Sequence, residues 1–399
     1  MAQLSPHFSP GKRLLPLLGA GILALLVRLV CFPGVSNDFT AFLSHWVTFF
    51  RENGGFGAFS QTVGDYNVPY LYYLAAISYL PGGEMYLIKL FSVGFDYLMA
   101  LGAMALVETF GGSGRRQVLA FSFTLLLPTV VLNSAYWGQC DSVFTCFLLW
   151  SLVLFFRNRP AAGMVCAGVA FAFKLQAVFL LPVLLLFLLA GKFKWRHVLL
   201  FPAAFFALCL PAVLLGKPFS QLFTVYLNQA GSYHHSLTLN APSLYALLPS
   251  TDPFPGAAPA GILLAALLVL AVSLRGFLVS AGRGRGGLTD RALLMAAVFF
   301  TVGIPLFLPY MHDRYFYIAD VLTLCYALCL PRRTLCCAGT QLASLGVYLA
   351  YLKIPGLLNP HYLWNKKVGA VLLLLVFLTL ARDFWRETKG ESLSASYKT

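Results

Sequence analysis

The chain has 399 residues, of which 59% are hydrophobic and 11% are charged, and its formal net charge is +14. This composition and a mean hydropathy of +0.78 exclude an ordinary soluble domain and predict a polytopic membrane protein. The positive charge is expected to orient the chain and to attract anionic lipid headgroups, so no nucleic-acid partner is expected. The predicted fold class is all-α, as a transmembrane helical bundle in one domain over residues 1–399.

Apolar segments predict about twelve membrane crossings, because about 20 apolar residues span a bilayer. The first, 14–33, has no small-residue cleavage site, so it is expected to be a retained span and not a removed signal peptide. Basic residues such as Arg285 and Arg332 fall in loops that this topology places inside, together with both termini. The predicted crossings are 14–33, 85–107, 117–135, 139–156, 161–174, 176–190, 198–215, 258–280, 291–309, 315–330, 335–352 and 368–382.

Segments that do not fit a simple crossing are placed on or near the outer side. The stretch 161–190 is bounded by cationic loops at both ends and must turn near Lys174. The stretch 69–81 is too short to cross comfortably and is predicted as an outer-face or partly inserted helix. Two long outer loops are predicted at 34–68 and 216–257. The first loop carries an amphipathic apolar stripe that predicts a helix lying at the membrane interface.

Five short polar segments interrupt the hydrophobic sequence, and the predicted topology places all of them on the outer side. Ionisable groups in water-poor surroundings are usually paired or functional. Because the five segments share one side, the sequence predicts that they contribute to one site. They are SNDFTAFLSHW at 36–46, GDYNVPYLY at 64–72, YWGQCDS at 136–142, FKLQ at 173–176 and PYMHDRYFY at 309–317.

The acidic and amide residues of the first three segments have both structural and functional interpretations. Asp38 either caps a helix, as Asp often does, or acts as a general base at the membrane surface. Asp65 and Asp141 can likewise cap the helices that follow them, and Trp137 can be an interfacial aromatic residue. Gln139 has no such structural explanation. An amide beside the carboxylate of Asp141 suits binding of a polar headgroup or a hydroxyl-rich ligand.

The basic residues of the last two segments suggest an anion site. Lys174, near Gln176, either extends its amine to the interface or binds a phosphate. His312, Asp313 and Arg314 are predicted at the start of a helix, where backbone N–H groups and cations bind anions. The alternative is a structural salt bridge between Asp313 and Arg314, although sequence neighbours do not face each other on a helix.

The order of these segments resembles the GT-C superfamily of polyprenyl-phosphate-sugar-dependent glycosyltransferases. The resemblance covers roughly residues 14–320 and is strongest to dolichyl-phosphate-glucose-dependent glucosyltransferases and their bacterial mannosyltransferase-like relatives. It rests on an acidic residue in the first outer loop, a Gln-bearing turn, a Lys-x-Gln turn and a late His-acid-base triplet. The segment YWGQCDS departs from the His-Phe-Gln-Tyr-Asn of eukaryotic members and keeps only the glutamine.

The resemblance implies a role for each matching position. Asp38 matches the family's first-loop aspartate, the base that deprotonates the acceptor hydroxyl. Asp65 matches an acidic residue before a Tyr-Pro-Pro segment, although Asn67-Val68-Pro69 replaces one proline here. The remaining matches are expected to bind substrate, with the basic groups holding the donor phosphate. They are Gln139, Lys174, Gln176, His312, Asp313 and Arg314.

The predicted reaction is a single inverting displacement that moves a hexose from a polyprenyl-phosphate carrier to a hydroxyl of a glycan or lipid-linked acceptor. The adjacent Cys336 and Cys337 lack ligand spacing and no DxD-type acidic cluster occurs, so no cofactor is required, although a divalent metal stays open. The bacterial-like WGQ and MHDRY sequences and the absence of an endoplasmic-reticulum retrieval signal favour a bacterial plasma membrane, an active site on the outer face and undecaprenyl phosphate as carrier.

Two other function classes fit parts of the sequence. A transporter or flippase of a polyprenyl-linked sugar would also place charges in a helical bundle. Transporters, however, usually bind substrate at the midplane between inverted repeats, and no inverted repeat is detected. A non-catalytic scaffold or polymer-assembly subunit would not need Asp38, Lys174 and Arg314 together. Transfer of sugar from the lipid carrier distinguishes the three.

Overall fold

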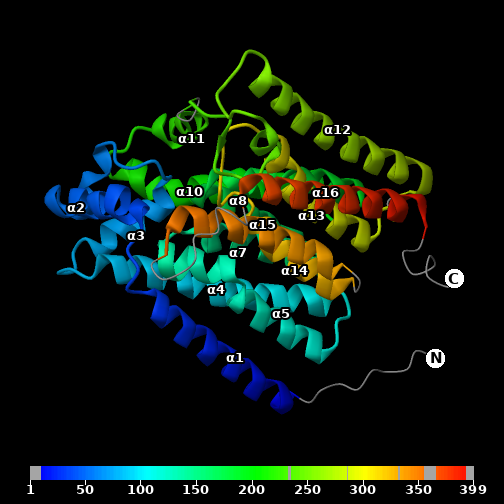
Figure 1. The fold of residues 1–399 in the computed structure, drawn as a ribbon, viewed down its shortest axis with the longest axis horizontal. Helices are drawn as coiled ribbons and strands as arrows, with labels where there is room; N and C mark the ends of the chain where they lie inside the picture. The colour runs from blue at the N-terminus through cyan, green and yellow to red at the C-terminus, as the bar shows by residue number, and fades with distance from the viewer. Residues whose placement is uncertain (1–9, 232–234, 285, 331–332, 355–364, 392–399) are drawn as a thin grey trace. The chain divides into compact units, whose positions relative to one another are not determined.

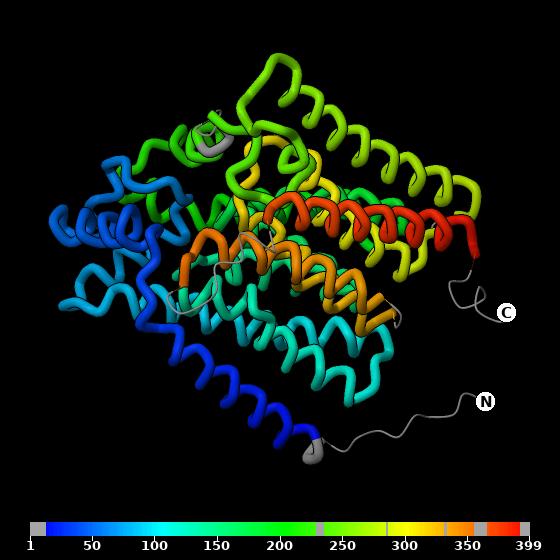
Figure 2. Tube along the Cα trace, in the orientation of Figure 1, coloured from blue at the N-terminus to red at the C-terminus, as the bar shows by residue number. Residues whose placement is uncertain are grey.

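The computed structural model describes residues 10–231, 235–284, 286–330, 333–354 and 365–391. Within these residues helices dominate, and the single sheet is a two-residue parallel pairing of β1 (Thr238–Leu239) with β2 (Met311–His312). Figure 1 labels the helices, and Figure 2 traces the same chain from the blue N-terminus to the red C-terminus. The all-α prediction is therefore confirmed at this level.

The helices follow the apolar segments of the sequence. In chain order they are α1 (Pro10–Cys31), α2 (Ser44–Glu52), α3 (Val68–Ile77), α4 (Glu84–Thr109), α5 (Gly114–Leu126), α6 (Pro128–Val131), α7 (Asp141–Phe156), α8 (Pro160–Phe173), α9 (Pro182–Leu189), α10 (Leu200–Leu214), α11 (Gln221–Gly231), α12 (Ala257–Arg283), α13 (Asp290–Phe307), α14 (Tyr317–Cys329), α15 (Thr334–Leu352) and α16 (Lys366–Lys389). Two π-helical turns, η1 (Phe39–Leu43) and η3 (Leu132–Trp137), and a 3-10 turn, η4 (Leu175–Phe179), position the residues of interest.

Helices occupy every segment predicted as a crossing, but not all of them are long enough to span a bilayer. Among the described residues, 7 helices are sufficiently long and apolar, or up to 8 if the pair Gly114–Leu126 and Pro128–Trp137, bent by 46°, forms one span. Several long apolar helices indicate a membrane protein. Shorter apolar helices fill the remaining segments, so the number of about twelve crossings stays a prediction. Arg285 and Arg332, which the topology uses, lie outside the described residues.

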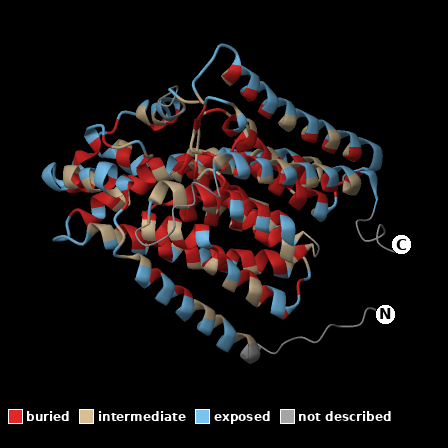
Figure 3. Ribbon diagram, in the orientation of Figure 1, coloured by how far each residue is buried: buried red, intermediate tan, exposed pale blue. Residues whose placement is uncertain are grey.

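Exposed leucines on the long helices are consistent with lipid contact. On α1, Leu15 is 78% exposed and Val30 is 82% exposed, and on α12 Leu270 is 60% exposed. Figure 3 shows these outward-facing stretches in pale blue and the buried positions in red. A water-soluble protein rarely exposes large apolar side chains in contiguous patches, whereas a bilayer solvates them.

The chain divides into two compact units. Unit 1 comprises Met1–Leu154, Ala161–Ala177 and Val198–Ser232, and unit 2 comprises Phe155–Pro160, Val178–His197 and Tyr233–Thr399. Within unit 1, α4 packs along α5, and within unit 2, α15 packs along α16. The prediction of one domain over the whole chain stays a prediction.

A buried ion pair holds the first helix of unit 1. Arg28 of α1 donates through Nε and Nη2 to Oδ2 of Asp96 on α4 at 3.0 and 2.8 Å, and Ser134 Oγ donates to the same oxygen at 2.5 Å. Both charged side chains are fully buried. Charges inside apolar helices persist when they are paired and hydrogen-bonded, so this contact explains why an arginine lies in the first apolar segment.

The predicted helix of the first long loop is present, but its apolar face is not left for a membrane. Val47 and Phe50 of α2 are fully buried, and the Phe50 ring lies 5.3 Å from Phe59. Both belong to a hydrophobic core that also contains residues of α3. The interfacial-helix prediction is therefore wrong for most of the stripe, because the loop folds back and buries it within unit 1.

Candidate functional site

Asp38 is buried and is held by two side-chain donors of the 136–142 segment. Its Oδ2 accepts from Trp137 Nε1 at 3.0 Å and from Gln139 Nε2 at 2.5 Å. Asp38 does not cap the turn that follows, because it makes no capping hydrogen bond. Instead Phe39 N–H donates to Ser36 Oγ at 3.2 Å. The capping interpretation of Asp38 is therefore wrong, and its carboxylate is directed towards the 136–142 segment.

Gln139 joins Asp38 to the second polar segment through Tyr66. The Tyr66 hydroxyl donates to Gln139 Oε1 at 3.0 Å, while the amide nitrogen of Gln139 donates to Asp38. The amide thus uses its acceptor for one segment and its donor for another. Trp137 is fully buried, so the interpretation of this tryptophan as an interfacial residue is wrong.

Backbone geometry brings Trp137 and Gln139 to the same carboxylate. The π-helical turn η3 ends at Gly138, which adopts a left-handed conformation with φ +77°. Gln139 N–H then donates to Asn133 O at 2.9 Å, which closes the turn. Glycine adopts positive φ without steric cost, so its presence here allows the sharp reversal between the two donors of Asp38.

Gly138→Ala is expected to lower the free energy of unfolding by about 1 kcal/mol, because alanine is strained at positive φ. Space does not limit the substitution, since the nearest atom to an added Cβ is 3.7 Å away. Thermal unfolding in detergent measures the effect. Gly94→Ala in α4 is the control, because its added Cβ meets nothing within 4 Å and its φ is not positive. Equal effects of the two variants would contradict the assignment.

Lys174 forms a buried ion pair and does not extend to an interface. Its Nζ donates to Asp141 Oδ1 at 2.5 Å, and the two side chains are 5% and 1% exposed. Asn133 Nδ2 donates to the other oxygen of Asp141 at 2.9 Å. Asp141 begins α7, yet its carboxylate serves these two partners from η3 and from the end of α8. The interpretation of Lys174 as a snorkelling side chain is therefore wrong.

Tyr66 links the Asp38 group to the Asp141 group. Lys174 Nζ lies 5.5 Å from the centroid of the Tyr66 ring, within the range of a cation–π contact. The network therefore runs from Asp38 through Gln139 and Tyr66 to Lys174 and Asp141. It joins four of the five polar segments inside unit 1. Chemically it offers a fixed carboxylate, an amide, a phenol and an ammonium–carboxylate pair.

Asp65 and Gln176 lie near this network with different roles. Asp65 does not cap α3, because the N-cap is Asn67, whose side chain accepts from Val68 N–H at 2.9 Å. Asp65 instead lines a pocket described below. Gln176 lies in η4 and is 6% exposed, and its Oε1 has no hydrogen-bond partner among the described residues. A buried amide oxygen of this kind is costly unless a ligand or water satisfies it.

His312, Asp313 and Arg314 belong to unit 2 and do not begin a helix. His312 ends β2, Asp313 N–H donates to Leu239 O at 3.2 Å, and α14 begins only at Tyr317. The predicted helix start at these three residues is therefore wrong, and their role in binding an anion stays a prediction. Arg314 Nη1 lies 3.9 Å from Asp313 Oδ1, a long ion pair between sequence neighbours that the strand-turn geometry permits.

Three residues of the network were not chosen as site residues from the sequence. Tyr66, Asn133 and Trp137 all hydrogen-bond to a predicted residue. Tyr66 and Trp137 lie in polar segments that the sequence singles out, so the signal was their position beside Asp65 and Gln139. Asn133 precedes its segment by three residues and is an isolated asparagine in an apolar stretch, which is itself a usable signal.

Comparison with protein-family models finds no match, and comparison with curated proteins finds none either. Within the described ranges, no group of three or more His, Cys, Asp or Glu side chains is arranged to hold a metal ion. The absence of a cofactor requirement stays a prediction.

Proposed function

We propose that the protein is an inverting glycosyltransferase of GT-C type that moves a hexose from a polyprenyl-phosphate carrier to an acceptor hydroxyl. One observation carries the proposal: a buried carboxylate, that of Asp38, is held by Trp137 and Gln139 and connected through Tyr66 to a buried ammonium, that of Lys174. An inverting transferase needs a fixed proton acceptor and a cation within one polar network.

In the proposed reaction, Asp38 accepts the proton of the acceptor hydroxyl as that oxygen attacks the anomeric carbon. The carbon–oxygen bond to the carrier phosphate breaks at the same time, and its electron pair leaves with the lipid phosphate. Trp137 and Gln139 hold the carboxylate in place, because both donate to one of its oxygens. Positioned donors of this kind reduce the reorganisation that the reaction requires.

The leaving phosphate needs positive charge, and the ion pair with Asp141 changes the part that Lys174 plays in it. Lys174 is already neutralised by Asp141 at 2.5 Å, so it supplies N–H donors more than net charge. The proposed part of Lys174 is therefore to orient the phosphate oxygens, with Asp141 and Asn133 fixing its position.

The membrane placement of the enzyme belongs to the same proposal. About twelve crossings, both termini inside and an active site on the outer face of a bacterial plasma membrane would give a lipid carrier lateral access. Undecaprenyl phosphate is the proposed carrier, and a glycan or a lipid-linked sugar is the proposed acceptor. The exposed apolar faces of α1 and α12 are compatible with such a lipid environment.

Transfer by the purified full chain tests the proposal. The protein in lipid nanodiscs is incubated with radiolabelled undecaprenyl-phosphate mannose or glucose and with extracted bacterial glycolipids as acceptors. Labelled product with an inverted anomeric configuration is expected. If neither donor gives product, and the protein in sealed vesicles instead moves the intact labelled lipid between leaflets, the transport alternative replaces the proposal. Neither transfer nor movement would favour the scaffold alternative.

A further inference from the structure

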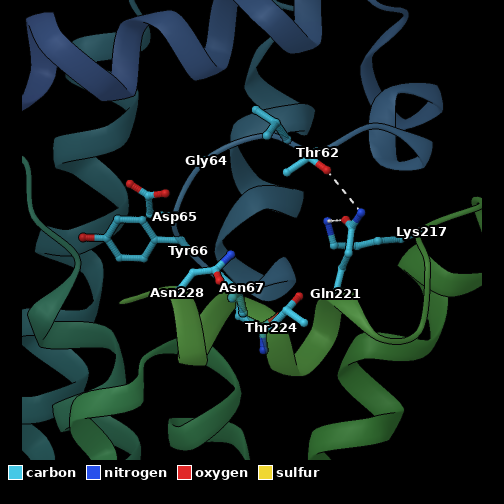
Figure 4. A pocket seen from close by; sticks show the side chains of 11 residues that line it. Thr62, Gly64, Asp65, Tyr66, Asn67, Lys217, Gln221, Thr224 and Asn228 are labelled. Carbon is cyan, nitrogen blue, oxygen red and sulfur yellow. Dashed lines mark hydrogen bonds between the residues drawn. The ribbon is translucent and has the colours of Figure 1, made fainter. Parts of the chain in front are cut away.

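A polar pocket lies beside the network in unit 1. The pocket has a volume of about 230 Å³, and residues 62–67 form one wall while Lys217 and α11 form the other. Figure 4 shows the side chains of Thr62, Gln221 and Lys217 linked on one side of the pocket and that of Asp65 on the other. Pockets for drug-sized ligands begin at about 300 Å³, so this smaller one suits a single sugar ring.

The lining chemistry is that of carbohydrate recognition. Lys217 Nζ donates to Gln221 Oε1 at 3.3 Å, and Gln221 Nε2 donates to Thr62 Oγ1 at 3.1 Å. The lining groups are therefore hydroxyls, amides, one carboxylate and one ammonium, together with apolar surface from Val63 and Val225. Sugar hydroxyls both donate and accept hydrogen bonds, and such a mixed set satisfies them.

Lys217 is the most informative residue of this pocket. It is only 7% exposed, and within the described part of the chain no carboxylate pairs with it. Burial lowers the pKa of its ammonium, since desolvation disfavours the charged form. The ammonium of Lys217 has three N–H donors, and its hydrogen bond to Gln221 Oε1 uses one of them, so two are available to other acceptors. A ligand oxygen in the pocket would satisfy them.

The helix that forms one wall of the pocket also has an exposed apolar face. Phe223 and Leu227 of α11 are 42% and 70% exposed, and Phe219 just before the helix is 56% exposed. The Phe219 ring stacks on Phe206 of α10 at 5.8 Å. The stripe therefore continues the exposed face of α10, part of a candidate membrane span, Trp195–Leu214. One side of α11 is suited to hydrocarbon and the other lines the polar pocket.

Tyr66 connects the pocket to the candidate base. It lines the pocket, and its hydroxyl donates to Gln139, which in turn donates to Asp38. A sugar in the pocket would thus contact a residue two hydrogen bonds from the carboxylate. A general base must lie within hydrogen-bond reach of the proton that it takes, so the acceptor hydroxyl would have to extend from the pocket past Tyr66 towards Asp38.

From these observations we propose that the pocket is a carbohydrate subsite that binds the sugar of a membrane-lipid acceptor, with Lys217, Gln221 and Thr224 on its α11 side. The sugar occupies the polar pocket, and the lipid chain lies along Phe219, Phe223 and Leu227. The acceptor role rests on the proposed function. Binding of a sugar-bearing lipid does not depend on it, so the two can fail separately.

Binding to the full chain in nanodiscs tests the subsite without any donor. The lipid-borne probes are dodecyl α-mannoside and dodecyl α-glucoside, and the free probes are methyl α-mannoside and methyl α-glucoside. At least one dodecyl glycoside is expected to bind, and the matching methyl glycoside to bind at least about tenfold more weakly, because it lacks the chain. Equal affinity of the two would overturn the lipid assignment, and no binding of any probe would overturn the subsite.

Two variants address the pocket itself. Thr224→Trp adds bulk from an exposed position and is expected to weaken binding by about tenfold or more, whereas Thr334→Trp, the same substitution at an exposed threonine of α15 that does not line the pocket, should stay within about twofold. Lys217→Met should also weaken binding, with the exposed Lys194→Met as its control. If both pocket variants bind the glycoside as tightly as the wild type, the subsite assignment is wrong, even if the wild type transfers hexose. If the pocket variants lose binding and the wild type transfers no hexose, the subsite assignment stands and the proposed glycosyltransferase activity is wrong.

Discussion

Asp38→Asn is expected to lower kcat for hexose transfer by about 10²–10⁴-fold, the range that a general base contributes. The amide keeps the size of the carboxylate and retains one oxygen to accept from Trp137 and Gln139. It cannot take up the acceptor proton at neutral pH. KM for the donor should change little, because the proposed phosphate contacts come from other residues. Initial rates with radiolabelled undecaprenyl-phosphate hexose measure both quantities.

The matched control for Asp38→Asn is Glu52→Gln, which removes one negative charge from the same loop. Glu52 is exposed at the end of α2 and is not one of the network residues, so its variant should transfer at the wild-type rate. Both variants should elute and unfold like the wild type. Full activity of Asp38→Asn at normal protein level removes the base assignment. Loss of activity accompanied by unfolding would assign Asp38 a structural part, and a kcat loss with unchanged folding supports the base.

The helices were predictable because apolar runs are separated by short polar or glycine- and proline-containing segments, which are visible in the local sequence. The number of membrane crossings was harder to predict, because it depends on helix lengths, which caps and turns determine. Helix α7 illustrates the difference, since its 16 residues extend about 24 Å at 1.5 Å per residue, whereas the hydrocarbon core is about 30 Å thick. Whether such a helix crosses depends on its neighbours.

The polar segments of the site were also visible in the sequence, but the inward-facing residue within each was not. In GDYNVPY the side chain that meets Gln139 is Tyr66, while Asp65 faces the pocket. In YWGQCDS a π-helical turn precedes Gly138, and its wider period shifts every side chain away from the 3.6-residue pattern. Local pattern alone therefore misassigned Trp137.

The prediction that His312, Asp313 and Arg314 begin a helix was wrong for a different reason. Its local sequence resembles a helix start after a proline, and the competing structure is a parallel pairing with Thr238–Leu239 about seventy residues earlier in the chain. A pairing of such sequence separation leaves no periodic trace in either segment. Only tertiary structure places His312 at the end of a strand and Asp313 in the turn after it.

Breaking the Lys174–Asp141 pair is expected to cost about 3–5 kcal/mol of unfolding free energy, because either single substitution leaves a buried charge without its partner. Lys174→Met leaves the Asp141 carboxylate beside Asn133 without its cation, and Asp141→Asn leaves the Lys174 ammonium near the Tyr66 ring without its anion. The double variant removes both charges and should lose less than the sum of the two singles. The difference, about 1–3 kcal/mol, is the coupling between residues in contact. Denaturant unfolding of the purified full chain measures each value.

A surface ion pair of the same kind supplies the control for this cycle. Lys192 Nζ lies 2.7 Å from Asp290 Oδ1, but the two side chains are 19% and 45% exposed, so Lys192→Met should cost no more than about 1 kcal/mol. If Lys174→Met is as mild as Lys192→Met, Asp141 does not depend on the lysine, and Lys174 would be kept for the ligand alone. If Lys174→Met is strongly destabilising and the double variant recovers stability without recovering hexose transfer, Lys174 serves both the fold and the phosphate. That second outcome is expected, since one ammonium has donors for both.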